Sequence, residues 1–279
     1  MPYIAEISRQ NPSCFLFMID QSGSMSDPFS GEPGRSKAQR LADAINRLIY
    51  ELTIRCTKSE SEGVRNYYEI GVIGYGGRVG PAWVGALSGK TLIPLREVAD
   101  NPGRLEERRR KVEDGAGGTI EERVKFPVWF DPIADNGTPI CGALRSAISI
   151  LEPWVKGHSA SFPPIAINIT DGEATDGDFR PAAEEIKQLS TDDGQCLLFN
   201  IHLSSRAGSP ILYCEDDSLP DEFSKMLFQS SSVLPPHIQE AAKAEGYKVG
   251  PTSRGFAFNA DIVEVIKFLD IGTRAKSLR

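Results

Sequence analysis

The sequence predicts a doubly wound α/β fold, in which a mainly parallel sheet carries helices on both faces. Short continuous apolar runs alternate along the chain with longer segments of helical periodicity. Continuous apolar runs are typical of strands buried on both faces, as they are in parallel sheets. Two of these runs end directly on an aspartate, at Asp20 and Asp171. Strands that alternate with helices imply right-handed crossovers and a sheet covered on both sides.

The first part of the chain predicts a strand, a helix and a second strand. Cys14 to Ile19 is a continuous apolar run that ends on Asp20. Ser36 to Cys56 is predicted to be an amphipathic helix, because its apolar residues recur at helical spacing. These residues are Leu41, Ala44, Ile45, Leu48, Ile49 and Leu52. Tyr67 to Tyr75 is typical of the next strand.

The second half of the chain continues this alternation. The expected strands are Pro164 to Thr170, Cys196 to Leu203 and Gly255 to Phe258, with an edge strand at Ile211 to Cys214. The expected helices are Cys141 to Leu151, which Pro153 is expected to stop, and Phe179 to Leu189, Asp221 to Gln229, His237 to Glu245 and Ala260 to Leu269.

The stretch from about Trp83 to Asn136 interrupts the alternation. It contains Gly, Pro and the charged run Arg104 to Lys111, which we interpret as a solvated helix face, with a docking surface for an acidic partner as the alternative. Its apolar content is too small for a core of its own. We therefore expect a single domain over residues 1–279, with its core at about 12–80 and 137–272 and a surface insertion at about 83–136.

Composition and charge exclude several classes of protein. Lys and Arg number 31 against 38 Asp and Glu, so the formal net charge is −7, whereas a nucleic-acid binder needs a basic surface. Met1 to Pro12 carries charged residues where a signal peptide needs an apolar run, and Cys14 to Ile19 is too short to span a membrane. The 5 cysteines lack C-x-x-C spacing, which favours a cellular compartment in which thiols stay reduced. We expect a cytoplasmic protein that binds neither nucleic acid nor membrane.

Three polar clusters are predicted to lie at one edge of the sheet. Asp20, Ser22 and Ser24 follow the first strand, where alternate side chains of an extended segment can face one point. Thr138 precedes a helix, and Asp171 follows a later strand. In open α/β sheets ligands bind beyond the carboxyl ends of the strands, so these five residues are candidates for one site.

The five side chains offer hard oxygen ligands, which suit an octahedral cation such as Mg²⁺, with Mn²⁺ as an alternative. Two carboxylates balance the charge, while neutral hydroxyls leave the ion able to accept a further carboxylate. The alternative is that Ser22 and Ser24 are turn residues and that Thr138 caps a helix. Capping explains poorly why Asp20 and Asp171 both end buried strands.

The sequence resembles the von Willebrand factor A family, and the resemblance covers nearly the whole chain. The family's metal-ion-dependent adhesion site is an Asp-x-Ser-x-Ser run with a distant Thr and a distant Asp, matched here by Asp20, Ser22, Ser24, Thr138 and Asp171. The resemblance implies a Rossmann-like fold and a cation whose coordination a Glu or Asp of a partner protein completes. The segment Gly255 to Asp261 also looks like the bacterial intracellular TerY-like subgroup, which is associated with tellurite resistance.

The remaining candidate motifs are better explained by a turn, by packing and by a helix start than by a functional site. The glycines at Gly74, Gly76 and Gly77 do not have dinucleotide-binding spacing, because Val79 stands where the third glycine belongs, so a tight turn is expected. A serine nucleophile needs a His base, and the histidines are expected to be surface or packing residues: His158, His202 and His237. Asp176 and Asp178 lack calcium-loop order and are expected to begin the next helix.

These observations predict a metal-dependent protein-interaction module rather than an enzyme. The resemblance implies a regulatory or scaffolding role in a bacterial stress-response or defence system. Two alternatives stay open. One is a hydrolase that uses the cation to activate water, although no catalytic base is evident. The other is a structural subunit in which the cation only stabilises the loops.

Overall fold

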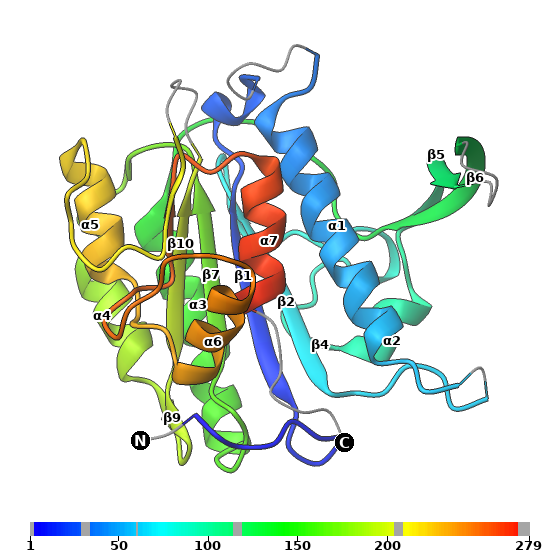
Figure 1. Cartoon of the computed structure of the whole chain (residues 1–279), viewed down its shortest axis with the longest axis horizontal. Coiled ribbons are helices and arrows are strands. Elements are labelled where there is room, and N and C mark those ends of the chain that lie inside the picture. Colours follow the sequence, from blue (N-terminus) through cyan, green and yellow to red (C-terminus); the bar gives the residue numbers. More distant parts are fainter. Residues whose placement is uncertain (1–2, 29–33, 60, 114–118, 204–208, 273–279) are drawn as a thin grey trace.

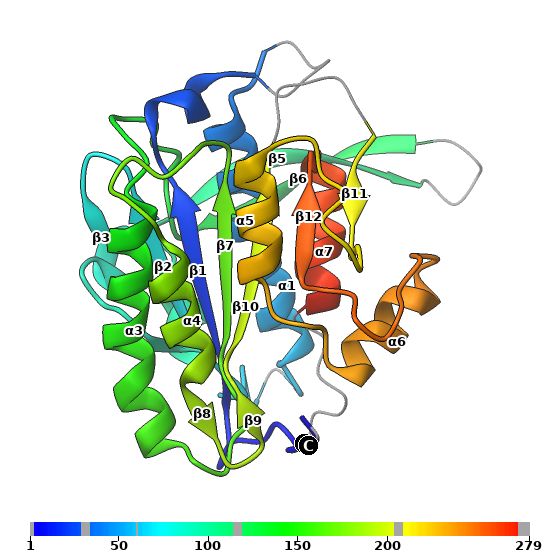
Figure 2. The ribbon, with the colours of Figure 1, turned by 90° about the vertical axis from the view of Figure 1, so that its left-hand side faces the viewer.

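The central feature of the molecule is a sheet that the computed structural model builds from eight strands in its described part, in the order β11-β12-β10-β7-β1-β2-β3, with β4 also paired to β2. Helices cover both faces (Figures 1 and 2). The predicted doubly wound α/β fold is confirmed. The described residues are 3–28, 34–59, 61–113, 119–203 and 209–272.

The strands in the middle of the sheet are all parallel, as the continuous apolar runs predict. They are β1 (Ser13–Asp20), β2 (Tyr68–Tyr75), β7 (Ile165–Thr170), β10 (Leu197–His202) and β12 (Phe256–Phe258). Short antiparallel strands lie at the edges: β3 (Val79–Pro81), β4 (Ile93–Pro94) and β11 (Ile211–Leu212).

Strand β1 divides the interior into two cores. Alternate side chains of a strand point to opposite faces, so Phe15 and Phe17 belong to one apolar cluster and Leu16 and Met18 to the other. The first cluster packs against α1 (Lys37–Arg55), α2 (Leu95–Asp100), α6 (Pro236–Ala244) and α7 (Ile262–Gly272). The second packs against α3 (Ile140–Gly157), α4 (Arg180–Gln188) and α5 (Glu222–Ser230). Burial on both sides explains why β1 is apolar throughout.

Helix α1 begins with a capping box. The Ser36 hydroxyl accepts a hydrogen bond from the Gln39 amide, and the Gln39 side chain accepts one from the Ser36 amide. The helix ends at Arg55, close to the predicted boundary. The loop before it continues from the short helix η1 (Gly23–Ser26), which contains Ser24.

Helix α3 continues past Pro153, so the predicted stop at this proline is wrong. A proline inside a helix removes one backbone hydrogen bond and strains the preceding turn. Here the next turn buries Trp154 and Val155, and the Trp154 indole donates a 3.0 Å hydrogen bond to Glu69. Trp154 also stacks on His158 with ring centroids 4.4 Å apart. These contacts offset the cost of the proline.

The charged run that was expected to be a helix face is a strand, and that prediction is wrong. β5 (Arg104–Glu113) pairs with β6 (Thr119–Val128) in an antiparallel hairpin that projects from the body near α1 (Figure 1). Arg and Glu favour helices by propensity, but pairing and tertiary contacts override so weak a preference. The strand's alternation places Glu106 and Arg108 on one face, and Arg108 bonds Asp43 of α1 at 2.7 Å.

On both sides of the hairpin, the 83–136 insertion contributes residues to the main core. Its buried apolar residues join the same cluster as α1, and they are Trp83, Leu87, Ile93, Leu95, Val98, Trp129 and Phe130. The buried side chain of Asn46 on α1 binds this segment. Its amide oxygen accepts the Trp129 amide at 2.7 Å, and its amide nitrogen donates to the carbonyl of Phe130 at 3.0 Å.

The remaining short elements lie outside the central layers. They are η2 (Gly85–Leu87) and the small hairpin of β8 (Ser190–Thr191) and β9 (Gly194–Gln195). In the ranges that the structure describes, no helix combines the length and hydropathy needed to cross a lipid bilayer.

Replacing Asn46 by Ala should lower the free energy of unfolding by about 2–3 kcal/mol, because buried backbone groups of Trp129 and Phe130 would lose their partners. Urea denaturation followed by circular dichroism measures this loss. As a control, Asn66→Ala removes an exposed side chain that accepts one bond from the Arg96 amide, and it should cost less than about 1 kcal/mol. Equal losses in the two variants would contradict the anchoring role of Asn46.

Candidate metal centre

The predicted site residues meet where the order of the sheet reverses. The chain passes from β1 through α1 to β2 on one side, and it later returns through α3 to β7 on the other side of β1. β1 and β7 are therefore neighbours at a topological switch point, where ligands of open α/β sheets bind beyond the strand ends. Asp20 is the last residue of β1, and Asp171 directly follows β7.

The buried carboxylate of Asp20 connects the first loop to the end of β7. One of its oxygens accepts the Ser22 amide at 2.8 Å, and the other accepts the Thr170 hydroxyl at 2.7 Å. Burial raises the pKa of Asp20, while the hydrogen bonds from Ser22 and Thr170 work against this rise. A cation near this carboxylate would favour its ionised form.

The carboxylate of Asp171 joins two further elements. Its Oδ1 accepts the Ser24 hydroxyl at 2.7 Å, and its Oδ2 accepts the Lys37 ammonium at 2.7 Å. The Asp171 side chain is 0% exposed and the Lys37 side chain 3% exposed. The hydroxyls of Ser22 and Ser24 lie 3.0 Å apart. Ser22 is buried whereas Ser24 is exposed, so the cluster reaches the surface at Ser24.

Thr138 reaches the same cluster from the loop before α3. This loop is joined to the first by two backbone hydrogen bonds, from Gly23 to the Asn136 carbonyl at 2.8 Å and from Asp135 to the Gln21 carbonyl at 2.7 Å. A Cβ added to Gly172 would lie 3.6 Å from the Thr138 hydroxyl and 3.9 Å from the Ser24 hydroxyl. The two hydroxyls thus face a common point beside Gly172.

Gly76 allows the loops to pack this closely. A Cβ at this position would lie 2.5 Å from the Gln21 carbonyl oxygen and 2.8 Å from that of Asp135. Such distances are too short for any side chain, so only glycine fits. The predicted tight turn after β2 is present between β2 and β3, and its glycine also makes room for two site loops.

Asp176 has a different role from the predicted one. Its carboxylate accepts the amides of Cys141 at 3.0 Å and Gly142 at 2.8 Å, at the start of α3. It therefore caps α3 rather than beginning the next helix, whereas Asp178 accepts the Arg180 amide at the start of α4, as expected. The N-cap position of α3 is Pro139 and not Thr138.

Lys37 is the site residue that the sequence reading missed. It lies on the buried stripe of α1, one turn before Leu41 and two turns before Ala44. A lysine at the amino end of a helix is unfavourable because the helix dipole is positive there. On the face that points to the core it is also a buried charge, which is costly without a buried anion as its partner. This combination was visible in the sequence and could have indicated a buried partner such as Asp171.

The three histidines make packing contacts, as expected. His158 stacks on Trp154, and the buried His202 stacks on Phe258 with ring centroids 5.0 Å apart. His237 lies edge-on to Phe162 at 5.5 Å.

The donor set fits a hard divalent cation. It combines two carboxylates with hydroxyls, which are the oxygen ligands that Mg²⁺ and Mn²⁺ accept. Within the described ranges, no group of three or more His, Cys, Asp or Glu side chains is arranged to hold a metal. The residues that would hold the ion are Asp20, Ser22, Ser24, Thr138 and Asp171.

The chain is similar to several solved structures, but only at low sequence identity. No protein-family model matches the sequence, and no curated protein matches it. Proximal thread matrix protein 1 from the mussel byssus is 14% identical with a TM-score of 0.44, over 80% of this chain and 42% of that one. The vWF domain of the type V pili tip protein Mfa5 from Porphyromonas gingivalis is 15% identical with a TM-score of 0.32, over 59% and 39%.

Human COPII-coat protein Sec24c is 11% identical with a TM-score of 0.35, over 71% of this chain and 26% of that one. The chain thus spans less than half of the length of each of these proteins. At such TM-scores the fold class rests on the strand order and the two helical layers themselves.

Mg²⁺ should raise the melting temperature of the wild-type protein, because an ion that binds only the folded state at 100 times its Kd adds about 2.7 kcal/mol. Thr138→Val keeps the shape of the side chain but removes its hydroxyl, and it should lose most of this rise. Thr191→Val is the matched control, since Thr191 is buried in β8, outside the site. Thermal unfolding in Mg²⁺ and in EDTA measures the rise in melting temperature for each variant. An equal rise in the two variants would contradict the assignment.

Proposed function

We propose that the chain is a von Willebrand factor A-type domain with a metal-ion-dependent adhesion site, and that it binds an acidic residue of a partner protein through Mg²⁺ or Mn²⁺. The observation that carries the proposal is the meeting of three sequence-distant loops at the switch point between β1 and β7. They bring together the five residues of the family motif, which are Asp20, Ser22, Ser24, Thr138 and Asp171.

The chemistry of the donors supports a binding role for the cation. Hydroxyls are neutral ligands, so they leave a divalent cation short of negative charge and able to take a carboxylate from outside. Ser24 is exposed while Asp20 and Ser22 are buried, which gives the cluster one side that a partner can reach. The bound cation would supply an electrophilic anchor for the partner's Glu or Asp.

Lys37 adds to this preference for an anion. Two carboxylates balance the charge of one Mg²⁺, so the ammonium of Lys37 on Asp171 leaves the loaded site with a net positive charge. Charges held in a buried pair are screened by solvent much less than exposed ones. The loaded site should therefore select a carboxylate over a neutral side chain.

The proposed role is binding rather than catalysis, within a bacterial stress-response or defence system. The biological setting follows from the resemblance of Gly255 to Asp261 to the TerY-like subgroup. That segment forms β12 and the loop before α7, and it contains none of the five residues of the cluster, so it bears on the setting and not on the chemistry of the site.

The proposal is tested by affinity capture from a cell extract of the source organism. Wild type, Thr138→Val and the control Thr191→Val serve as baits, each in Mg²⁺ and in EDTA, with circular dichroism to verify folding. A partner that binds through the cation should be recovered by wild type and by the control in Mg²⁺ only, and should be lost with Thr138→Val. Capture that persists in EDTA, or with Thr138→Val, would contradict the proposal.

A further inference from the structure

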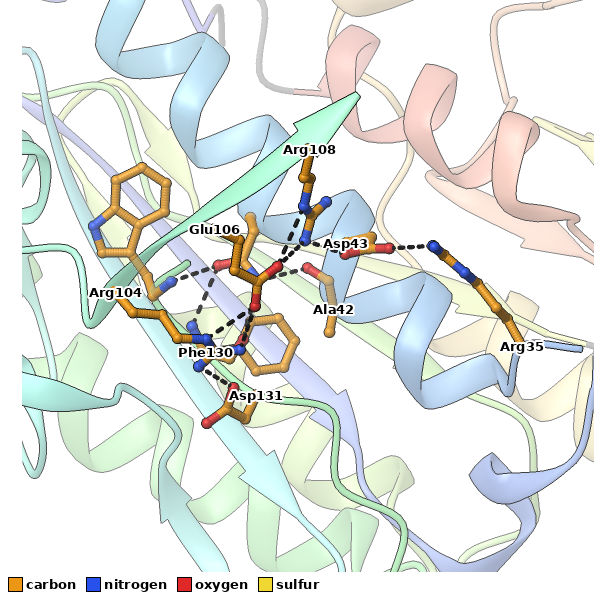
Figure 3. Close-up of polar contacts among 10 residues, drawn as sticks. Arg35, Ala42, Asp43, Arg104, Glu106, Arg108, Phe130 and Asp131 are labelled. Atoms are coloured by element: carbon orange, nitrogen blue, oxygen red, sulfur yellow. Dashed lines mark hydrogen bonds and ion pairs between the residues drawn. The ribbon is translucent and has the colours of Figure 1, made fainter. Parts of the chain in front are cut away.

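A groove runs between α1 and the β5–β6 hairpin. It consists of two adjoining hollows of about 540 Å³ and 750 Å³, and Arg35, Asp43, Arg108 and Arg109 line both. Figure 3 shows side chains from α1, from the hairpin and from the loop before α1 pointing toward one another across it. The groove thus lies between two elements that are distant in sequence.

The charge of this groove is opposite to that of the whole chain. The protein carries a formal net charge of −7. The two hollows together, in contrast, are lined by more cations than acids: Arg35, Arg40, Arg47, Arg104, Arg108, Arg109 and Lys125 against Asp43, Glu51, Glu106 and Glu107. An excess of positive charge in one concave place of an acidic protein favours an anionic ligand.

Ion pairs fix the walls of the groove. Arg108 bonds both Asp43 at 2.7 Å and Glu106 at 2.9 Å, and its guanidinium lies 3.8 Å from the centre of the Phe126 ring. Arg35 bonds the other oxygen of Asp43 at 2.9 Å. Asp43 therefore pairs with Arg108 of the hairpin through one oxygen and with Arg35 of the loop before α1 through the other (Figure 3). A guanidinium group has five N–H donors, so arginines held by such pairs can also donate to the carboxylates of a ligand.

The groove also has an apolar part. Tyr50 is 37% exposed and Ile54 is 54% exposed on the outer face of α1. Tyr50 lies 6.2 Å from Phe126 of the hairpin, in an edge-on arrangement. Large exposed apolar side chains next to a basic groove give a ligand somewhere to place a hydrophobic side chain.

We propose that this groove binds an extended acidic segment of a partner protein, whose carboxylates meet the arginines and whose apolar side chain rests on Tyr50 and Ile54. The cations of the groove are interspersed with acids such as Asp43 and Glu51, whereas a nucleic-acid backbone needs a less interrupted basic surface. An acidic peptide fits this pattern better. Peptide binding at the groove is independent of the metal, because none of the groove residues belongs to the proposed cation site.

The experiment uses a fluorescein-labelled peptide of the sequence EEFEELE and measures fluorescence anisotropy in EDTA, so that a failure of the metal site cannot affect the result. Wild type should bind this peptide, and added salt should weaken the binding. Arg35→Glu/Arg47→Glu reverses two exposed charges of the groove, and it should weaken binding about tenfold, because each reversal replaces an attraction by a repulsion.

The matched control is Lys156→Glu/Arg180→Glu on α3 and α4, on the other face of the sheet. It makes the same change in net charge and also removes one surface ion pair at each position. It should change the affinity by less than about twofold, since exposed charges separated by more than a Debye length are largely screened. Circular dichroism verifies that both double variants are folded.

Three results would overturn the proposal. The first is that wild type does not bind the acidic peptide. The second is that the groove variant and the control variant weaken binding equally, which would make the effect one of net charge. The third is that an oligothymidylate of the same charge, or the peptide KKFKKLK, binds more tightly than EEFEELE.

Discussion

The buried carboxylate of Asp171 is the constraint on which the arrangement of the candidate site depends. A carboxylate removed from water is costly unless charge and hydrogen bonds compensate it. Here the compensation comes from the ammonium of Lys37 and the hydroxyl of Ser24. Because these groups belong to α1 and to the loop after β1, satisfying this carboxylate also brings those elements to the end of β7. The buried charge thus positions the loops that carry the remaining donors.

Strand topology makes this meeting possible. β1 lies between β7 and β2, so the chain must leave on one side and return on the other, which opens a crevice at their carboxyl ends. The long insertion between β2 and α3 is fixed to α1 by Asn46 and to the main core by residues such as Trp129. It therefore delivers Thr138 to the crevice on a well-supported loop, and the same insertion forms one wall of the basic groove.

The buried strands and the positions of Asp20 and Asp171 could be predicted because both follow from local patterns: continuous apolar runs and the polar residues that end them. The hairpin at Arg104 could not, since its sequence favours a helix and only contacts with α1 and β6 decide against this. The continuation of α3 past Pro153 likewise depends on burial of the following turn. Lys37 differs from these, because the helical spacing of the sequence already places it on the buried stripe of α1.

The central claim is that Asp20, Ser22, Ser24, Thr138 and Asp171 hold one divalent cation. The most direct measurement is the anomalous difference density of crystals grown with Mn²⁺, recorded at the manganese edge. We expect one strong peak, bonded directly or through water to these five side chains, with the ammonium of Lys37 still on Asp171. Crystals with an accessible site but no such peak, or with the strong peak at other residues, would contradict it.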